Sequence, residues 1–487
     1  MVSRTTWYRG VLATATAVLL GVTAAASPAL AEPNNNNSRK LRQAVTAEGV
    51  FTHLKALQKI AEENGGTRVS GSPGYDKSID YAESVFQAAG FRVTQQSFDF
   101  QTFRSLSPSV LQQVSPEPAG DVTHSLASYS GSGDVTEPAS LPTGRPTGCT
   151  TEDFGAANVG TVVIIIRGDC TFGEKASAAA DAGAAAVIIY NNVEGVLNAT
   201  LGGDFTKDIS AVTVTLEVGQ ELVAQVPAGL TLRMKTETFR GIATTSNIFA
   251  ESTWGDPNNV VMAGAHLDSV AEGPGINDNG SGSATLLEIA KQMQKVKPKN
   301  KVRFALWGAE ESGLLGAHHY IDNLPEAERE KISLYLNFDM IGSPNYVRFV
   351  YDGDNSAFPV GPGAAPGPEG SGAIEQLFHD YFASQGLASA ETPFSGRSDY
   401  GPFIEVGIPA GGLFTGAEGI KTEAEAAIYG GTAGISYDPC YHQACDDIDN
   451  VSVQAIDEMA DAVAHAIITY AFDTSSIVKP TKGKGKK

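Results

Sequence analysis

Three apolar runs in the second half of the chain have the pattern of buried strands, and each ends in polar residues. They are NVVMAGAHLDS (259–269), KVRFALWG (301–308) and LYLNFDMIG (334–342). Between the first two lies SATLLEIAKQMQKV (283–296), whose apolar residues recur at helical spacing, and a second such helix is predicted at 451–472. Alternating strands and helices predict an α/β fold with a mostly parallel sheet covered by helices on both faces.

The N-terminal part of this α/β pattern consists of two helices and a strand. The first helix is predicted to end at Gly65, because glycine commonly follows the last helical turn. Ser72 is a typical N-cap and Pro73 suits the first helical position, so a second helix is predicted from there to Gly90. FRVTQQSFDF (91–100) has the composition of a strand.

The middle of the chain has a different character. Residues 105–130 are rich in Ser, Pro and Gly, which predicts a linker or irregular excursion. Residues 160–192 then predict a strand, a helix that starts with a Thr171/Glu174 capping box and ends at Gly183, and another strand. Because catalytic residue types are not concentrated there, we predict a smaller inserted domain. The expected divisions are 38–125 and 241–474 for the larger domain, 126–240 for the insert and 475–487 for a disordered basic tail.

Length and charge narrow the classes of function. A chain of 487 residues predicts two or three domains, and 42% hydrophobic residues are enough for real cores. The formal net charge of -21 at pH 7 argues against a nucleic-acid partner, because phosphate binding requires concentrated Lys and Arg. The basic cluster at the end, KPTKGKGKK, is too rich in Gly and Lys to pack.

The first 31 residues have the pattern of a secretory signal peptide. Arg4 and Arg9 precede a short apolar stretch, and ALA at 29–31 is a small-residue cleavage pattern before Glu32. A membrane anchor is the alternative, but the apolar run falls short of the ~20 residues that a spanning helix needs. We therefore expect a secreted protein whose mature chain does not span a membrane. Export permits disulfides, and of three possible pairings sequence proximity favours Cys149 with Cys170 and Cys440 with Cys445.

Side chains suited to binding metals follow the predicted strands. In open α/β sheets, ligands bind beyond the carboxyl ends of the strands. A lone acid after a strand is usually a turn residue and a lone His is usually structural, but several of them at successive strand ends are hard to explain as coincidence. The set comprises His266, Asp268, Asp278, Glu310, Glu311, Asp339 and His442.

The chemistry of this set favours zinc. Two imidazoles and several carboxylates form a nitrogen and oxygen ligand set suited to that metal, and the sequence contains no Cys-x-x-Cys pair for a structural thiolate site. A two-metal site needs a bridging carboxylate and a group that deprotonates water. The adjacent Glu310 and Glu311 can therefore have different roles, one binding metal and the other acting as general base.

These motifs resemble a known family. TRVSGSPG, GAHLDS, GINDNGSG, WGAEESG, NFDMIG, GRSDYGPF and CYHQACDD occur in the order found in secreted di-zinc aminopeptidases of the bacterial leucine aminopeptidase and aminopeptidase Y type. The inserted block resembles the protease-associated domain that this family often contains. Together the two resemblances cover nearly the whole mature chain. They imply a zinc exopeptidase-like fold with two zinc ions per chain.

The resemblance also implies roles for individual residues. It assigns His266, Asp278, Glu311, Asp339 and His442 as the metal ligands, with Asp278 bridging. Glu310 corresponds to the general base and Asp268 to a carboxylate that orients a ligand histidine. Tyr441 corresponds to a phenol that stabilises the oxyanion, and a disulfide between Cys440 and Cys445 would hold its loop. Arg397 is expected to help shape the substrate site.

The expected function is hydrolysis of the N-terminal peptide bond of peptides or proteins through a metal-bridging water. A preference for large apolar N-terminal residues such as Leu is expected, with Phe394 and Phe403 as candidate pocket walls. The protein is expected to be a monomer. Relatives with this fold also include carboxypeptidases and glutaminyl cyclases, and a carboxypeptidase would need a basic pocket, for which Arg397 is the obvious candidate. An inactive peptidase-like binding protein is the alternative from another class.

Overall fold

The computed structural model describes residues 34–361 and 364–477. The predicted signal peptide and nearly all of the predicted tail lie outside these residues. Residue Ile477, inside the range expected for the tail, is buried with 6% of its surface exposed and belongs to the main core. Among the described residues, no helix combines the length and the apolar character that crossing a membrane requires.

One 14-stranded mixed sheet runs through the protein, in the order β13-β12-β14-β11-β9-β10-β8-β4-β5-β6-β7-β3, with β1 paired to β8. Its central strands β9, β10, β11 and β14 are parallel, whereas β12 and β8 are antiparallel to their neighbours β14 and β10. The α/β fold with a mixed sheet is therefore confirmed. The strands of the larger domain are β8 (Thr231–Glu251), β9 (Asp256–His266), β10 (Asn300–Trp307), β11 (Ile332–Phe338), β12 (Phe349–Tyr351), β13 (Ala390–Thr392) and β14 (Ala410–Phe414).

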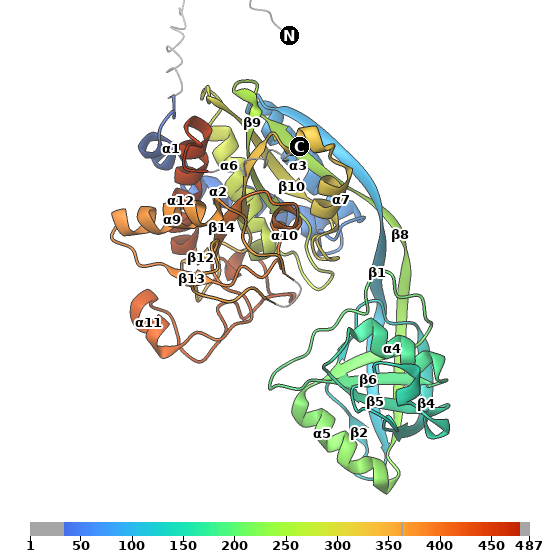
Figure 1. Ribbon diagram of the computed structural model, residues 1–487. Coiled ribbons are helices and arrows are strands. Elements are labelled where there is room, and N and C mark those ends of the chain that lie inside the picture. The colour runs from blue at the N-terminus through green and yellow to red at the C-terminus, as the bar shows by residue number, and fades with distance from the viewer. Residues whose placement is uncertain (1–33, 362–363, 478–487) are drawn as a thin grey trace, which may run out of the picture. The chain divides into compact units, whose positions relative to one another are not determined.

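Helices cover both faces of this part of the sheet (Figure 1). Alternate residues of β9 enter two different cores, because side chains along a strand alternate between faces. Val261 and Ala263 belong to a core that includes residues of α2, α3, α6, α9 and α12, whereas Val260 and Met262 belong to one that includes residues of α7 and α10. The helices are α1 (Ser38–Ala44), α2 (Ala47–Glu63), α3 (Pro73–Ala88), α6 (Ser281–Gln292), α7 (Leu315–Asn323), α8 (Glu326–Arg329), α9 (Ser371–Ser384), α10 (Gly401–Glu405), α11 (Glu423–Tyr429) and α12 (Val453–Phe472).

Local signals in the sequence account for several helix ends. The Ser72 hydroxyl accepts a hydrogen bond from the Tyr75 backbone N–H, and Pro73 occupies the first turn of α3, as predicted. In the inserted domain, Thr171 and Glu174 form the predicted capping box at the start of α4 (Phe172–Asp181). These caps satisfy backbone N–H groups that would otherwise lack partners in the first helical turn.

The expectation of an irregular excursion at 105–130 is wrong for its first part. Strand β1 (Arg92–Ser115) continues to Ser115 and pairs with β8 along that length, from Arg92–Glu251 to Ser115–Thr231. Its ladder shifts register on both sides of Ser107, and such irregularities let a strand accommodate the Pro and Ser residues that mimic a loop. The short strands β2 (Gly120–Asp121) and β3 (Ser125–Leu126) follow.

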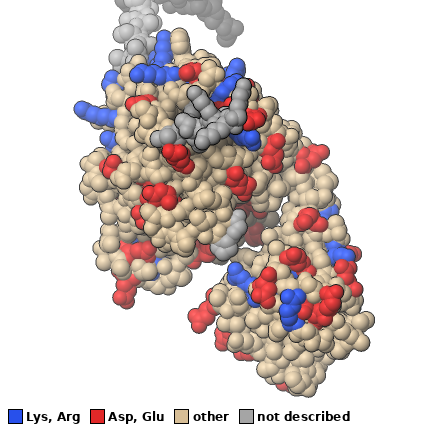
Figure 2. Space-filling model, viewed as in Figure 1, with Lys and Arg blue, Asp and Glu red and all other residues tan. Residues whose placement is uncertain are grey.

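The inserted domain contributes one end of the 14-stranded sheet together with its own helices. Strands β5 (Val162–Ile166), β6 (Ala186–Tyr190) and β7 (Ser210–Val214) are parallel, with β4 (Gly133–Ser140) joining β5 to β8. Helices α4 and α5 (Leu216–Gln225) accompany them, and the predicted Cys149–Cys170 disulfide is present. On the face seen in Figure 2, acidic side chains are widely scattered, consistent with the net charge of -21.

Candidate metal centre

The carboxyl ends of the central strands bring the predicted ligands together. His266 is the last residue of β9, and the register pairs it with Trp307, the last residue of β10. Asp339 directly follows β11. Glu310 and Glu311 follow β10 after two small residues. Parallel strands that end at the same edge therefore place side chains from distant parts of the chain around one point.

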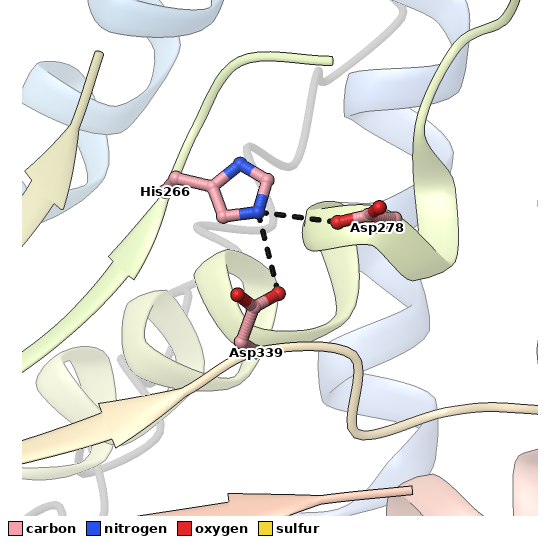
Figure 3. Close-up of side chains that lie close together, drawn as sticks. All are labelled: His266, Asp278 and Asp339. Carbon is pink, nitrogen blue, oxygen red and sulfur yellow. Dashed lines mark hydrogen bonds and ion pairs between the residues drawn. The ribbon is translucent and has the colours of Figure 1, made fainter. Parts of the chain in front are cut away.

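One group of ligand atoms surrounds His266 (Figure 3). Its Nε2 atom lies 3.1 Å from Asp278 Oδ1 and 3.3 Å from Asp339 Oδ1. Glu310 Oε2 is 4.0 Å from the same nitrogen. Asp278 comes from the loop before α6, so three separate chain segments meet at this imidazole.

A second group surrounds His442, in the loop closed by the Cys440–Cys445 disulfide. His442 Nε2 lies 3.2 Å from Asp278 Oδ2 and 3.1 Å from Glu311 Oε2. Asp278 thus directs one carboxylate oxygen towards each of the two imidazoles. This is the arrangement expected of a carboxylate shared by two cations.

The electrostatics of the cluster fit a cation. Burial raises the pKa of Glu311 to about 7, with His442 acting in the opposite direction, and burial raises the pKa of Glu310 well above its usual range. Burial opposes the charged form of His442, but Glu311 and Asp278 raise its pKa to about 11. Among the described residues, Glu311 Oε1 is a buried oxygen with no hydrogen-bond partner. Closely packed acids with an unpartnered oxygen are the donor set that a divalent cation with nitrogen and oxygen ligands requires.

Asp268 contacts both His266 and the segment after β10. His266 Nδ1 lies 3.1 Å from the Asp268 backbone carbonyl oxygen and 3.6 Å from the Asp268 carboxylate oxygen Oδ1. The same Oδ1 accepts a hydrogen bond from the Glu310 backbone N–H at 3.3 Å. This residue therefore links the orientation of His266 to the position of Glu310.

Comparison with known proteins decides the family. Residues 247–467 match the model of peptidase family M28, and residues 132–222 match the PA domain. An aminopeptidase from Pseudomonas aeruginosa is 44% identical over 462 residues, which are 92% of this chain and 85% of that protein. The chain belongs to peptidase family M28. It is a peptidase with an inserted PA domain.

Another similar protein and two solved structures are also aminopeptidases by name. Leucine aminopeptidase 2 of Arthroderma otae is 38% identical, covering 92% of this chain and 89% of that protein. The solved structure of an aminopeptidase from Aneurinibacillus sp. strain AM-1 superimposes with a TM-score of 0.72 at 28% identity, over 91% of this chain and 98% of that one. A zinc aminopeptidase from Bacillus subtilis gives a TM-score of 0.65 at 27% identity, over 87% and 95%.

A cavity of about 1050 Å³ opens onto the candidate metal centre of this M28 peptidase, and its lining includes Tyr441 and Arg397. The ring of Tyr441 stacks on His442 with 3.9 Å between centroids. Burial raises the pKa of the Tyr441 hydroxyl far above its usual range, so it stays protonated. The Arg397 side chain is 72% exposed and lies 3.5 Å from Glu418.

The expectation that Phe394 and Phe403 form pocket walls is wrong. Both are buried in the core, where Phe403 stacks on Tyr335 with 4.0 Å between centroids. The apolar part of the cavity lining instead includes Met340, Tyr351 and Phe414. For Phe403, proximity to Arg397 in the sequence is a poor guide, because Phe403 lies on α10, where successive side chains point in different directions.

Several residues that support the metal ligands of this M28 peptidase were not predicted from the sequence. Ser398, in GRSDYGPF, donates a hydrogen bond of 2.5 Å to Asp339 Oδ2. The Asp446 carboxylate accepts the backbone N–H groups of Asn277, at 2.8 Å, and Asp278, at 3.0 Å. Arg68, in TRVSGSPG, is fully buried beside the ligand loops. All three residues lie in motifs that resemble the family, namely GRSDYGPF, CYHQACDD and TRVSGSPG. Their contacts around the ligands depend on tertiary folding, so the motifs alone do not reveal them.

Proposed function

We propose that this M28 peptidase is a zinc-dependent aminopeptidase that hydrolyses the first peptide bond of peptides or proteins with a free N-terminus. The observation that supports this best is Asp278, whose two oxygens lie 3.1 and 3.2 Å from the Nε2 atoms of His266 and His442. A carboxylate between two imidazoles suits a pair of metal ions. The names of the relatives, aminopeptidase and leucine aminopeptidase 2, agree with the proposed reaction.

Two Zn²⁺ ions per chain are proposed as cofactors. The residues that would hold them are His266, Asp278, Glu311, Asp339 and His442, with Asp278 shared between the two ions. When bound, zinc acts as a Lewis acid and lowers the pKa of water. This fits the donor set, because imidazole nitrogen and carboxylate oxygen are typical zinc ligands.

Glu310 is proposed as the general base. Its carboxylate is buried beside the ligands, and burial raises its pKa, which strengthens it as a base when it is ionised. It would take the proton from the attacking water and pass it to the amine that leaves. The hydrogen bond from its backbone N–H to Asp268 would keep it in place during the transfer.

Tyr441 and Arg397 are proposed to contact the substrate. A protonated Tyr441 hydroxyl in the cavity would donate a hydrogen bond to the carbonyl oxygen as negative charge develops there. Arg397 would line the substrate site, but its ion pair with Glu418 reduces its value as a partner for a substrate carboxylate. The acid-rich cavity favours a substrate ammonium group, and hence an aminopeptidase over a carboxypeptidase.

Substrate preference and location complete the proposal. Met340, Tyr351 and Phe414 give the cavity apolar walls, which supports a preference for large apolar N-terminal residues such as Leu. The two disulfides support secretion after removal of residues 1–31. We also propose that the mature chain is a monomer, with the larger domain at 38–125 and 241–474 and the PA domain at 126–240.

The decisive experiment combines metal analysis with two substrates. The purified mature protein is analysed for bound metal and assayed with leucine para-nitroanilide and its N-acetylated form, with and without a chelator. About two zinc ions and chelator-sensitive cleavage of the free-amine substrate alone are expected. Bound zinc with neither substrate cleaved would favour a carboxypeptidase or glutaminyl cyclase. Protein that binds no metal and cleaves neither substrate would favour an inactive binding protein.

A further inference from the structure

Arg68 contacts both ends of the single segment that joins β9 to α6, although it lies about 200 residues earlier in the sequence. Its side chain is 0% exposed. The guanidinium donates to the carbonyl oxygens of Leu267, Pro274 (2.9 Å) and Gly275 (2.5 Å). Leu267 lies directly after His266, and Gly275 lies three residues before Asp278.

The backbone of Arg68 strengthens this connection. Its N–H donates to Ser269 Oγ at 2.9 Å, and the Ser269 N–H donates to the Arg68 carbonyl oxygen at 3.3 Å. Within the segment between β9 and α6, the backbone also folds closely on itself. Gly275 has φ +63°, and a Cβ there would lie 2.4 Å from the Asp278 carbonyl oxygen and 2.5 Å from Ser269 Cβ.

The charge of Arg68 suits this place. Burial lowers its pKa to about 10, and Asp268, Asp446 and Asp278 act in the opposite direction, so the guanidinium stays charged at neutral pH. A buried cation is costly unless its donors are paired and acids lie nearby. Three backbone carbonyls and three carboxylates meet both needs, which a lysine with a single ammonium group would meet less well.

We propose that Arg68 is a positioning residue, a clamp that fixes both ends of the segment between β9 and α6 and thereby holds the proposed metal ligands His266 and Asp278 at their observed separation. This inference rests on the proposed function, because it assigns Arg68 to the proposed metal centre. Arg68 touches backbone atoms beside the ligands rather than substrate, so loss of the clamp first affects metal affinity.

A buried cation elsewhere in the chain provides a matched control. Lys175 in the inserted domain is also 0% exposed, and its Nζ donates to the carbonyl oxygens of Thr147, at 2.5 Å, and Gly168, at 2.6 Å. Lys175→Met removes buried hydrogen bonds to backbone carbonyls without touching the segment between β9 and α6. The change in stability and zinc affinity of Lys175→Met therefore shows what loss of a buried, hydrogen-bonded cation does in general.

The test compares Arg68→Lys, Ser269→Ala and Lys175→Met in the full mature protein. Zinc ions are the probe, and their dissociation constants are measured by competition with a chromophoric chelator. Thermal unfolding of the zinc-free proteins is recorded in parallel. Arg68→Lys is expected to weaken zinc binding by about 10- to 100-fold, the usual effect of losing support around a ligand. Ser269→Ala should weaken it less, and Lys175→Met should lower the unfolding temperature while leaving zinc affinity unchanged.

Two results would overturn the clamp. In the first, Ser269→Ala binds zinc with wild-type affinity, and Arg68→Lys either also binds zinc with wild-type affinity or fails to fold. The other is a loss of affinity in Lys175→Met as large as in Arg68→Lys, which would show a general effect of instability. If the wild-type protein itself binds no zinc, the proposed metal centre fails and the clamp fails with it. The zinc titration of the wild-type protein therefore distinguishes failure of the proposed metal centre from failure of the Arg68 clamp alone.

Discussion

Glu310 and Glu311 are neighbours in the sequence but face different imidazoles. Glu310 Oε2 lies 4.0 Å from His266 Nε2, whereas Glu311 Oε2 lies 3.1 Å from His442 Nε2. The backbone leaves β10 and turns at Ala309, which has φ +55°, immediately before the two glutamates. Because the two identical side chains approach different imidazoles, substitutions at the two positions should have different consequences.

Replacing the proposed base should separate catalysis from metal binding. Glu310→Gln keeps the size of the side chain but removes its ability to take a proton. We expect zinc content to stay at the wild-type level, with kcat lower by about 10²- to 10⁴-fold and KM little changed. Steady-state kinetics with leucine para-nitroanilide and metal analysis of the same sample measure both quantities. Near-normal turnover would show that another group accepts the proton.

Replacing the proposed ligand should have the opposite pattern. Glu311→Ala removes an oxygen that lies 3.1 Å from His442 Nε2, so we expect zinc content to fall and activity to recover partly in excess zinc. Glu272→Ala is the matched control, since Glu272 also lines the cavity but is exposed and outside the cluster. Full zinc content in Glu311→Ala, equal to that of the control, would contradict the ligand role.

The fold and the cluster were predictable because strong local patterns determine both. Apolar runs determine the buried strands, and polar residues after parallel strands meet at one edge of the sheet whatever the details of packing. The two disulfides and the capping box at Thr171 are local in sequence and were also predicted correctly. The roles of the clustered residues stay predictions until they are tested.

What sequence reasoning missed depends on partners far along the chain. Strand β1 continues to Ser115 because β8 pairs with it, and local Ser and Pro content conceals that pairing. Arg68 resembles an ordinary surface arginine until the carbonyls of the ligand loops surround it. Phe403 was misplaced because its direction depends on α10 and on stacking with Tyr335.

Removing metal should destabilise the protein as well as inactivate it. Without metal ions, Glu311 is buried close to Asp278, whose negative charge disfavours ionisation of Glu311. A ligand that binds only the folded state stabilises it by about 2.7 kcal/mol at 100 times its Kd. We therefore expect chelator treatment to lower the unfolding temperature and abolish activity, and added zinc to restore both. Full activity and an unchanged unfolding temperature after verified metal removal would contradict the metal requirement.

Loss of the Tyr441 hydroxyl should slow turnover without weakening substrate binding. In Tyr441→Phe the ring can still stack on His442, so the loop and the metal ligand stay in place. We expect kcat to fall by about 10²- to 10³-fold with KM nearly unchanged, as for loss of one oxyanion donor. Tyr437→Phe is the control, because it also removes a tyrosine hydroxyl, but one that donates a hydrogen bond to Glu425 at 2.9 Å. Equal kcat values for the two variants would remove Tyr441 from the mechanism.

Glu375 on α9 should make stability depend on pH. Burial raises its pKa from 4.5 to about 7, and Asp354 and Asp352 contribute in the same direction, while backbone N–H groups of Gly353 and Asp354 oppose the shift. The folded state therefore holds a proton that the unfolded state has released between pH 4.5 and 7. This contribution to stability is complete below pH 4.5 and is lost as the pH rises to 7.

In the wild-type protein the Gly353 N–H donates a hydrogen bond to Glu375 Oε2 at 2.8 Å. Glu375→Gln removes the titration of this side chain but keeps an oxygen that can accept that hydrogen bond. Relative to wild type, the free energy of unfolding of Glu375→Gln should therefore rise by about 1–3 kcal/mol between pH 5 and pH 8. Chemical denaturation of both proteins at the two pH values measures this difference. Glu62→Gln, at an exposed position of α2, is the control and should show little change. A difference that is constant with pH would mean that Glu375 is already ionised in the folded protein at pH 5.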